Sequence, residues 1–192
     1  MNKEENRIAC IGWGSLVWDD SRDLPLLSGW RENGPSLPVE FARESGGSRI
    51  TLVICKDTPR VQTLWAIAEA VDVATARRQL GVREHPPASP EWIETEIGYW
   101  DKWSGKSHGG EAETIAAWAE SKGLAGVVWT NLPCGFSGKA RRGIMPPGEA
   151  IVAHLRGLAG EERAEAEKYV RRAPAQIDTP YRKLIAEQLG WD

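Results

Sequence analysis

The sequence predicts an α+β fold with a mixed, largely antiparallel sheet, flanking helices and a helical C-terminal segment. Two observations predict it. Short apolar or alternating runs typical of strands fall in the first two thirds of the 192 residues, and apolar residues at helical spacing follow residue 146. The length suits a single domain over residues 1–192, with a core near 7–130 and C-terminal helices near 146–192.

Six segments are predicted as strands. Residues 8–12 (IACIG) form a short apolar run that ends at glycine, which is typical of a buried strand. After a turn-rich, irregular segment over 19–37, three runs separated by turns predict an antiparallel meander, namely PVEFARE, RITLVICK and VQTLWAIAEAV. Alternation in IETEIGYW and the apolar run AGVVWTN predict two more strands.

Helix boundaries follow from capping residues. Asp72 is a suitable N-cap and Gly81 a suitable C-cap, so we expect a short helix between them and place Glu84 just beyond its end. A helix over 111–122 ends before Gly123. The C-terminal segment contains three more, over 148–157, over 161–172, and from the N-cap Thr179 to the C-cap Gly190.

Composition excludes several classes of partner. The formal net charge is −3 and no long Lys/Arg run occurs, so we expect no nucleic-acid partner. No apolar run approaches the roughly 18 residues of a transmembrane helix, so we expect no membrane partner. A small-molecule substrate remains as the expected partner, and the sequence leaves the oligomeric state open.

The N-terminus indicates the cellular location, and the cysteines indicate whether a disulfide or metal site is expected. The stretch MNKEENRIACIG has no apolar segment of signal-peptide length, which favours a cytoplasmic location. Cys10, Cys55 and Cys134 are far apart, odd in number and without CxxC spacing. We therefore expect neither a disulfide framework nor a metal site.

The segment Gly12-Trp13-Gly14-Ser15-Leu16 follows the first predicted strand. Two glycines around one bulky residue allow a tight turn that exposes backbone N–H groups, and such a loop suits an anion. The alternative is a tight turn that needs glycine for steric reasons only.

Glu84 is the first candidate catalytic residue. Its predicted place beyond a helix C-terminus puts the carboxylate near partial negative charge, which disfavours the ionised form and suits a general base. The alternative is a solvated loop glutamate paired with Arg83 or Arg78.

Cys134 is a second candidate, because nearby cations favour a thiolate nucleophile. The loop cations are Lys139, Arg141 and Arg142, which are also able to hold a substrate carboxylate. A thiol hydrolase would need a histidine nearby, from among His85, His108 and His154. The alternative is a loop cysteine and a solvated basic loop without function.

The order of these motifs resembles the gamma-glutamylcyclotransferase-like family, which includes gamma-glutamylcyclotransferases, ChaC glutathione-degrading enzymes and BtrG-type proteins. Gly14-Ser15-Leu16 match its GSL-type signature, with Trp13 in the aromatic place. The run Leu80-Gly81-Val82-Arg83-Glu84 fits its L-x-x-R-E pattern, and Gly98-Tyr99 is similar to the Gly-Tyr that follows, displaced by an inserted HPPASP. The resemblance covers roughly residues 7–130.

The resemblance implies a mixed sheet or small barrel and a transferase or lyase reaction. The alpha-amine of a gamma-glutamyl compound attacks its own gamma-carbonyl and releases 5-oxoproline and an amine, with Glu84 as general acid/base. It implies substrate contacts from Gly12, Trp13, Gly14, Ser15, Leu16 and Tyr99. It implies no metal or organic cofactor. Two alternatives stay open: a non-catalytic small-molecule binding module on the same fold, and a thiol hydrolase using Cys134.

Ten tryptophans against two phenylalanines are unusual. Trp65 and Trp129 lie in strand runs, which predicts core positions for them. Three others follow Glu84 and predict an aromatic wall beside it, suited to a bulky or apolar leaving group: Trp92, Trp100 and Trp103.

Overall fold

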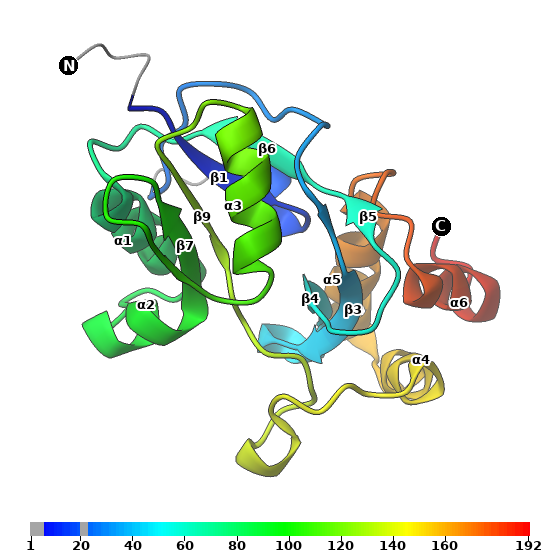
Figure 1. Ribbon diagram of the computed structural model, residues 1–192. Coiled ribbons are helices and arrows are strands. Elements are labelled where there is room, and N and C mark those ends of the chain that lie inside the picture. Colours follow the sequence, from blue (N-terminus) through cyan, green and yellow to red (C-terminus); the bar gives the residue numbers. More distant parts are fainter. Residues whose placement is uncertain (1–5, 20–22) are drawn as a thin grey trace. The chain divides into compact units, whose positions relative to one another are not determined.

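The computed structural model describes residues 6–19 and 23–192 (Figure 1). Its described residues form an α+β structure with six α-helices and a mixed five-stranded sheet. The predicted α+β class and mixed sheet are confirmed. The N-terminal residues 1–5, and residues 20–22 of the turn-rich segment, lie outside the described residues.

The chain divides into two compact units, each made of three separate stretches. Unit 1 contains Met1–Gly12, Asp19–Pro35 and Gln62–Leu132. Unit 2 contains Trp13–Trp18, Ser36–Val61 and Pro133–Asp192.

Unit 1 is built on the five-stranded sheet, whose strand order is β6-β1-β9-β7-β8. Its strands are β6 (Leu64–Ile67), β1 (Ile8–Gly12), β9 (Gly126–Thr130), β7 (Ile97–Asp101) and β8 (Lys106–His108). The two strands at the centre of the unit, β1 and β9, run parallel, and the other neighbouring pairs run antiparallel. Every residue of β1 is buried, which explains its continuous apolar sequence. The short, exposed β8 gave no strand signal in the sequence.

The predicted meander is correct for its first two strands and wrong for the third. In unit 2, β3 (Val39–Glu44) and β4 (Ile50–Ile54) pair antiparallel. The third run forms β6, which pairs antiparallel with β1 in unit 1. All four residues of β6 are buried although β6 is the edge strand of the sheet, and a bridge between Arg31 and Trp65 covers part of its outer edge. The remaining short elements are β2 (Ser36–Leu37), β5 (Val61–Gln62), η1 (Ser15–Val17), η2 (Gly46–Ser48) and η3 (Lys139–Arg141).

Helix α1 (Val73–Glu84) begins as predicted and ends later than predicted. The Asp72 side chain accepts a hydrogen bond from the Thr75 N–H at 2.7 Å. The predicted stop at Gly81 is wrong, since Gly81 is a buried interior residue and the helix continues to Glu84. A Cβ at position 81 would lie 2.6 Å from Ile93 Cγ1, so this glycine permits the close approach of α2 (Pro90–Glu96). Glu84 is therefore the last helical residue.

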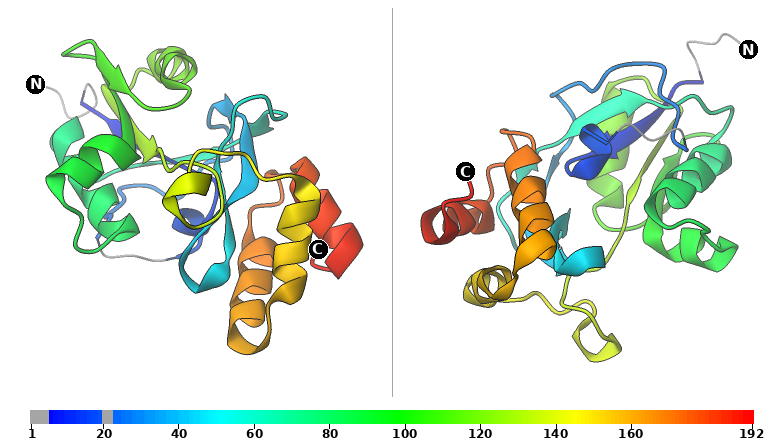
Figure 2. Two further views of the ribbon diagram at one scale, coloured as in Figure 1. Left: turned by 90° about the horizontal axis from the view of Figure 1, so that it is seen from below. Right: turned by 180° about the vertical axis from the view of Figure 1, so that it is seen from behind.

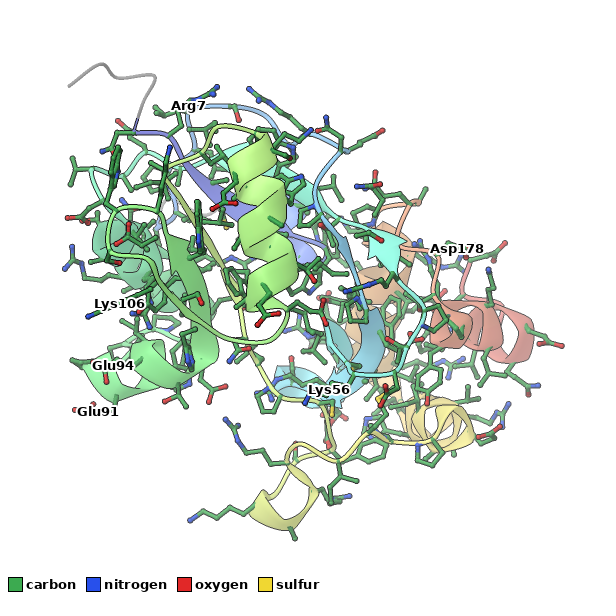
Figure 3. The ribbon with its side chains drawn as sticks, viewed as in Figure 1. Arg7, Lys56, Glu91, Glu94, Lys106 and Asp178 are labelled. Carbon is green, nitrogen blue, oxygen red and sulfur yellow. The ribbon has the colours of Figure 1, made fainter. Side chains whose placement is uncertain are left out.

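The first half of the predicted strand over 93–100 is helical. Ser89 caps α2 by accepting a hydrogen bond from the Trp92 N–H at 3.2 Å, and Pro90 occupies its first turn. The strand begins only at Ile97. Glu91 and Glu94 are exposed and point outward from α2 (Figure 3).

Helices α1 and α3 (Ala112–Ser121) cover opposite faces of the sheet in unit 1. Cys10 and Tyr99 both pair with Val128, which places the three side chains on one face. The Arg77 guanidinium of α1 lies 4.3 Å from the Tyr99 ring centroid, so α1 covers this face.

The opposite face is rich in tryptophan. Trp65 pairs with Ile11, the neighbour of Cys10, and its ring lies 5.3 Å from that of Trp118 on α3. Trp129 is fully buried. The core positions predicted for Trp65 and Trp129 are confirmed. Figure 1 shows α3 across the front of this sheet.

Unit 2 contains α4 (Gly148–Gly157), α5 (Gly160–Arg172) and α6 (Pro180–Leu189), close to the predicted bounds (Figure 2). The Thr179 hydroxyl accepts a hydrogen bond from the Arg182 N–H at 3.2 Å, and Gly190, with φ of +71°, ends α6. No helix in the described part of the chain is long and apolar enough to cross a bilayer.

Candidate functional site

The structure assigns the predicted site residues to both units. Gly12, Glu84 and Tyr99 belong to unit 1, whereas the segment from Trp13 to Leu16 belongs to unit 2. We call residues 13–18 of unit 2 the GSL loop.

Glu84 is a half-buried carboxylate at the end of α1. Its side chain is 15% exposed, and its Oε1 lies 2.7 Å from Nη1 of Arg83. The Arg83 side chain is 8% exposed and also reaches Asp19 Oδ2 at 3.3 Å. Among the described residues, Oε2 of Glu84 has no hydrogen-bond donor, whereas its other oxygen is fixed. Pairing with Arg83 was one alternative for a solvated glutamate, but here the pair is sheltered from solvent.

Glu84 lies close enough to Cys10 of β1 for its charge to affect the Cys10 thiol. The Cys10 thiol is fully buried, and this burial raises its pKa, with a further increase from the negative charge of Glu84. Arg83 acts in the opposite direction. Glu84 is thus within electrostatic reach of the strand that ends at Gly12, while the Cys10 thiol is kept neutral.

Tyr99 lies beneath α1. The Arg77 guanidinium covers its ring and also donates to the carbonyl oxygens of Ile93 at 3.1 Å and Ile97 at 3.3 Å. Burial lowers the pKa of Arg77. The sequence therefore identified Tyr99 without its arginine partner, and its contact with substrate stays a prediction.

The predicted aromatic wall beside Glu84 is wrong. Trp100 is buried and alternates with Tyr99 along β7, so it points to the opposite face of the sheet. Trp103 is 64% exposed in the turn after β7. Of the three, only Trp92 contacts the residue after Glu84, because its ring stacks on that of His85 with the centroids 5.0 Å apart. Strand alternation and the turn explain why three tryptophans close in sequence separate in space.

The GSL loop is anchored by its tryptophan. Trp13 is 3% exposed, and its Nε1 donates to the Leu52 carbonyl of β4 at 3.1 Å. Gly14 precedes η1, whose turns are closed by hydrogen bonds from Val17 N–H to Gly14 O (2.9 Å) and from Trp18 N–H to Ser15 O (3.1 Å). The N–H groups of Gly14 and Leu16 find no acceptor within the described residues. Such unpaired N–H groups are expected at the start of a helical turn and suit an anion.

Sequence reasoning missed the involvement of Tyr169 in the loop. Tyr169 lies on the buried face of α5 and is 7% exposed. Its Oη accepts a hydrogen bond from the Leu52 N–H at 3.3 Å and lies against Gly14. No local pattern connects two positions so far apart in the sequence, so only the structure reveals this contact.

Cys134, the second candidate catalytic residue, is half-buried in unit 2 next to Cys55. Burial and the Cys134 thiol raise the pKa of Cys55 to about 12. In the described part of unit 2, no histidine lies within hydrogen-bonding distance of Cys134, and His154 Nε2 instead contacts the Ser48 carbonyl at 2.7 Å. The loop cation Arg141 lies over the Phe136 ring at 5.6 Å. These contacts give Cys134 no base within its unit.

Within residues 6–19 and 23–192, no group of three His, Cys, Asp or Glu side chains is placed to hold a metal ion. Comparison with known proteins finds no matching family model, no matching curated protein and no matching solved structure. Function is therefore inferred below from the residues and their surroundings.

Proposed function

We propose that this chain is a gamma-glutamylcyclotransferase-like enzyme with the mixed sheet or small barrel of that family. The alpha-amine of a gamma-glutamyl compound attacks the gamma-carbonyl carbon, a carbon–nitrogen bond closes a five-membered ring, and the original amide bond breaks. The products are 5-oxoproline and an amine. The order of the GSL and L-x-x-R-E motifs supports the proposal.

The observation that carries the proposal is the state of the Glu84 side chain. Arg83 fixes Oε1 at 2.7 Å, and the second oxygen has no donor among the described residues. A sheltered carboxylate with one fixed and one available oxygen suits a general base. Glu84 takes a proton from the substrate ammonium, which frees the attacking amine, and returns a proton to the leaving nitrogen.

The GSL loop supplies the second function, which is to hold negative charge. The N–H groups of Gly14 and Leu16 bind the alpha-carboxylate of the substrate or the oxyanion that develops on its gamma-carbonyl. Trp13 fixes this loop through Leu52. Because the attack is intramolecular, holding the glutamyl chain in a folded conformation removes much of the entropic barrier.

The direct test is turnover by the purified full chain. A panel of gamma-glutamyl amines and peptides is incubated with the protein, and 5-oxoproline is followed by mass spectrometry. We expect Glu84→Gln to lower kcat by about 100-fold or more, because the amide cannot accept the proton. Glu120→Gln, a change at an exposed glutamate of α3, serves as the matched control and should leave kcat unchanged.

Two outcomes would contradict the proposal. The first is equal turnover by Glu84→Gln and the unaltered protein. The second is a compound that raises the melting temperature but keeps its mass after long incubation, which would identify a binding module instead.

A further inference from the structure

Helix α5 of the C-terminal segment contacts the GSL loop within unit 2, at positions beyond the stretch that carries the family resemblance. We infer that Tyr169 on this helix is a positioning residue for the GSL loop, because its hydroxyl oxygen lies against Gly14 and sets how closely the loop approaches α5. The catalytic consequence of this inference rests on the proposed function, whereas the effect on loop structure does not.

The hydroxyl of Tyr169 is held between a strand and the loop. Its Oη accepts a hydrogen bond from the Leu52 N–H at 3.3 Å, while the Leu52 carbonyl accepts from Trp13 Nε1 at 3.1 Å. One residue of β4 thus binds the loop directly through its carbonyl and binds the tyrosine through its amide.

Close approach explains the glycine at position 14. The φ of Gly14 is −125°, so this glycine does not occupy the left-handed region that favours glycine. A Cβ at this position would lie 2.4 Å from Tyr169 Oη but 3.5 Å from Cζ. The hydroxyl oxygen is therefore the atom that excludes a side chain.

A second contact of α5 reaches the other end of the loop. Arg172 is three residues after Tyr169 and so lies on the same side of the helix. Its Nη2 donates to the Trp18 carbonyl at 3.4 Å, and its guanidinium lies 5.9 Å from the Trp18 ring centroid. The Trp18 ring also packs edge-on against Tyr169 at 5.4 Å. Two residues of one helix thus hold both ends of a six-residue segment.

The experiment uses reciprocal substitutions at the contact. Gly14→Ala is expected to displace the loop, because its methyl group meets the hydroxyl. Tyr169→Phe keeps the ring against Trp18 and removes only the oxygen. In the double variant, the alanine methyl then meets Cζ at an ordinary contact distance of 3.5 Å. Tyr169→Phe should therefore suppress the effect of Gly14→Ala.

Tyr181→Phe is the matched control for the suppression. Its hydroxyl donates one hydrogen bond to the Pro146 carbonyl at 2.9 Å, in the same unit but away from the GSL loop. Combined with Gly14→Ala, it should give no recovery. This control separates release of a specific contact from a general effect of losing a tyrosine hydroxyl.

Two readouts are measured on the full chain. The first is ¹⁹F NMR of protein labelled with 5-fluorotryptophan, where the Trp13 and Trp18 resonances, assigned with Trp→Phe variants, report loop structure. We expect Gly14→Ala to shift both resonances and the double variant to restore them. The second is KM for the gamma-glutamyl compound that the unaltered protein turns over, expected to rise about tenfold in Gly14→Ala and to recover in the double variant.

The two readouts distinguish two failures. If the unaltered protein turns over no gamma-glutamyl compound, the proposed function is wrong, and the NMR comparison still decides the role of Tyr169. The inference is overturned if Gly14→Ala leaves both resonances unmoved, if the double variant stays displaced, or if Tyr181→Phe restores the loop equally well.

Discussion

At the scale of single residues, the buried carboxylate Glu40 of unit 2 connects a strand to a helix. Glu40 on β3 is fully buried and accepts hydrogen bonds from the Phe41 N–H at 2.8 Å and the Tyr181 N–H at 3.2 Å, and from the Thr179 hydroxyl. These donors join the start of α6 to the strand. Burial nevertheless raises the pKa of Glu40 above its ordinary value of 4.5, against the effect of the donors.

A raised pKa in the folded state predicts the sign of the pH dependence. Its stabilising contribution is complete below pH 4.5 and is lost as the pH rises through the folded-state value. The unfolding free energy of the unaltered protein, relative to Glu40→Gln, should therefore fall as the pH rises above 4.5 in urea titrations. The difference in unfolding free energy between the unaltered protein and the exposed-site variant Glu120→Gln should not change with pH. A relative stability that rises with pH would show that the donors outweigh burial.

Site residues were predictable from sequence only where a motif is local. Glu84 and the GSL loop could be selected because each belongs to a short run with its own chemical reason. Tyr169 could not, because its contact with Gly14 depends on how α5 packs. The roles of Glu84 and the loop stay predictions until turnover is measured.

At the scale of elements, helix termini were predictable where a capping side chain decides them. Asp72 and Thr179 both accept the expected hydrogen bond from the backbone N–H three residues later. The prediction that Gly81 ends the helix was wrong because glycine also occurs where two helices pack closely. The sequence alone does not distinguish this use of glycine from a C-cap. The alternation of residues 93–96 fits one helical turn as well as a strand, and β6 was assigned the wrong partner because strand pairing is a long-range choice.

Gly81 provides a prediction at this scale. Alanine is favoured over glycine inside helices by about 1 kcal/mol, but overpacking costs about 1–3 kcal/mol. Because a Cβ would lie 2.6 Å from Ile93 Cγ1, we expect Gly81→Ala to lower the unfolding free energy by about 1 kcal/mol, measured by urea denaturation.

The matched control is Gly157→Ala at the last residue of α4, where an added Cβ meets no atom within 4 Å. Its unfolding free energy should stay equal or rise. Stabilisation by Gly81→Ala of the same size as at Gly157 would show that α1 and α2 do not pack closely there.

At the scale of the whole molecule, the units share the chain in alternating stretches. The chain changes unit after Gly12, Trp18, Pro35, Val61 and Leu132. The sequence predicted the secondary structure along most of this path but contains no composition change or linker that would mark such alternation. The C-terminal helices belong to the same unit as β3 and β4, to which Glu40 joins α6.

This arrangement predicts the behaviour of a truncated chain. A fragment ending at Leu132 retains β3 and β4 but lacks α5 and α6, so Glu40 loses its partners Thr179 and Tyr181. We expect its β3 and β4 amides to lose at least about tenfold of their protection against hydrogen exchange. The strands β1 and β9 of unit 1 provide the internal reference. Unchanged protection in β3 and β4 would contradict the prediction.

The contact between Gly14 and Tyr169 has a consequence for the order of events during synthesis. Gly14 leaves the ribosome early, but the tyrosine that lies against it follows only after every strand of the sheet in unit 1 has been made. Domains generally fold as their residues emerge, so the sheet can assemble first. The GSL loop would then be among the last parts of the molecule to take its final shape, after α5 has docked.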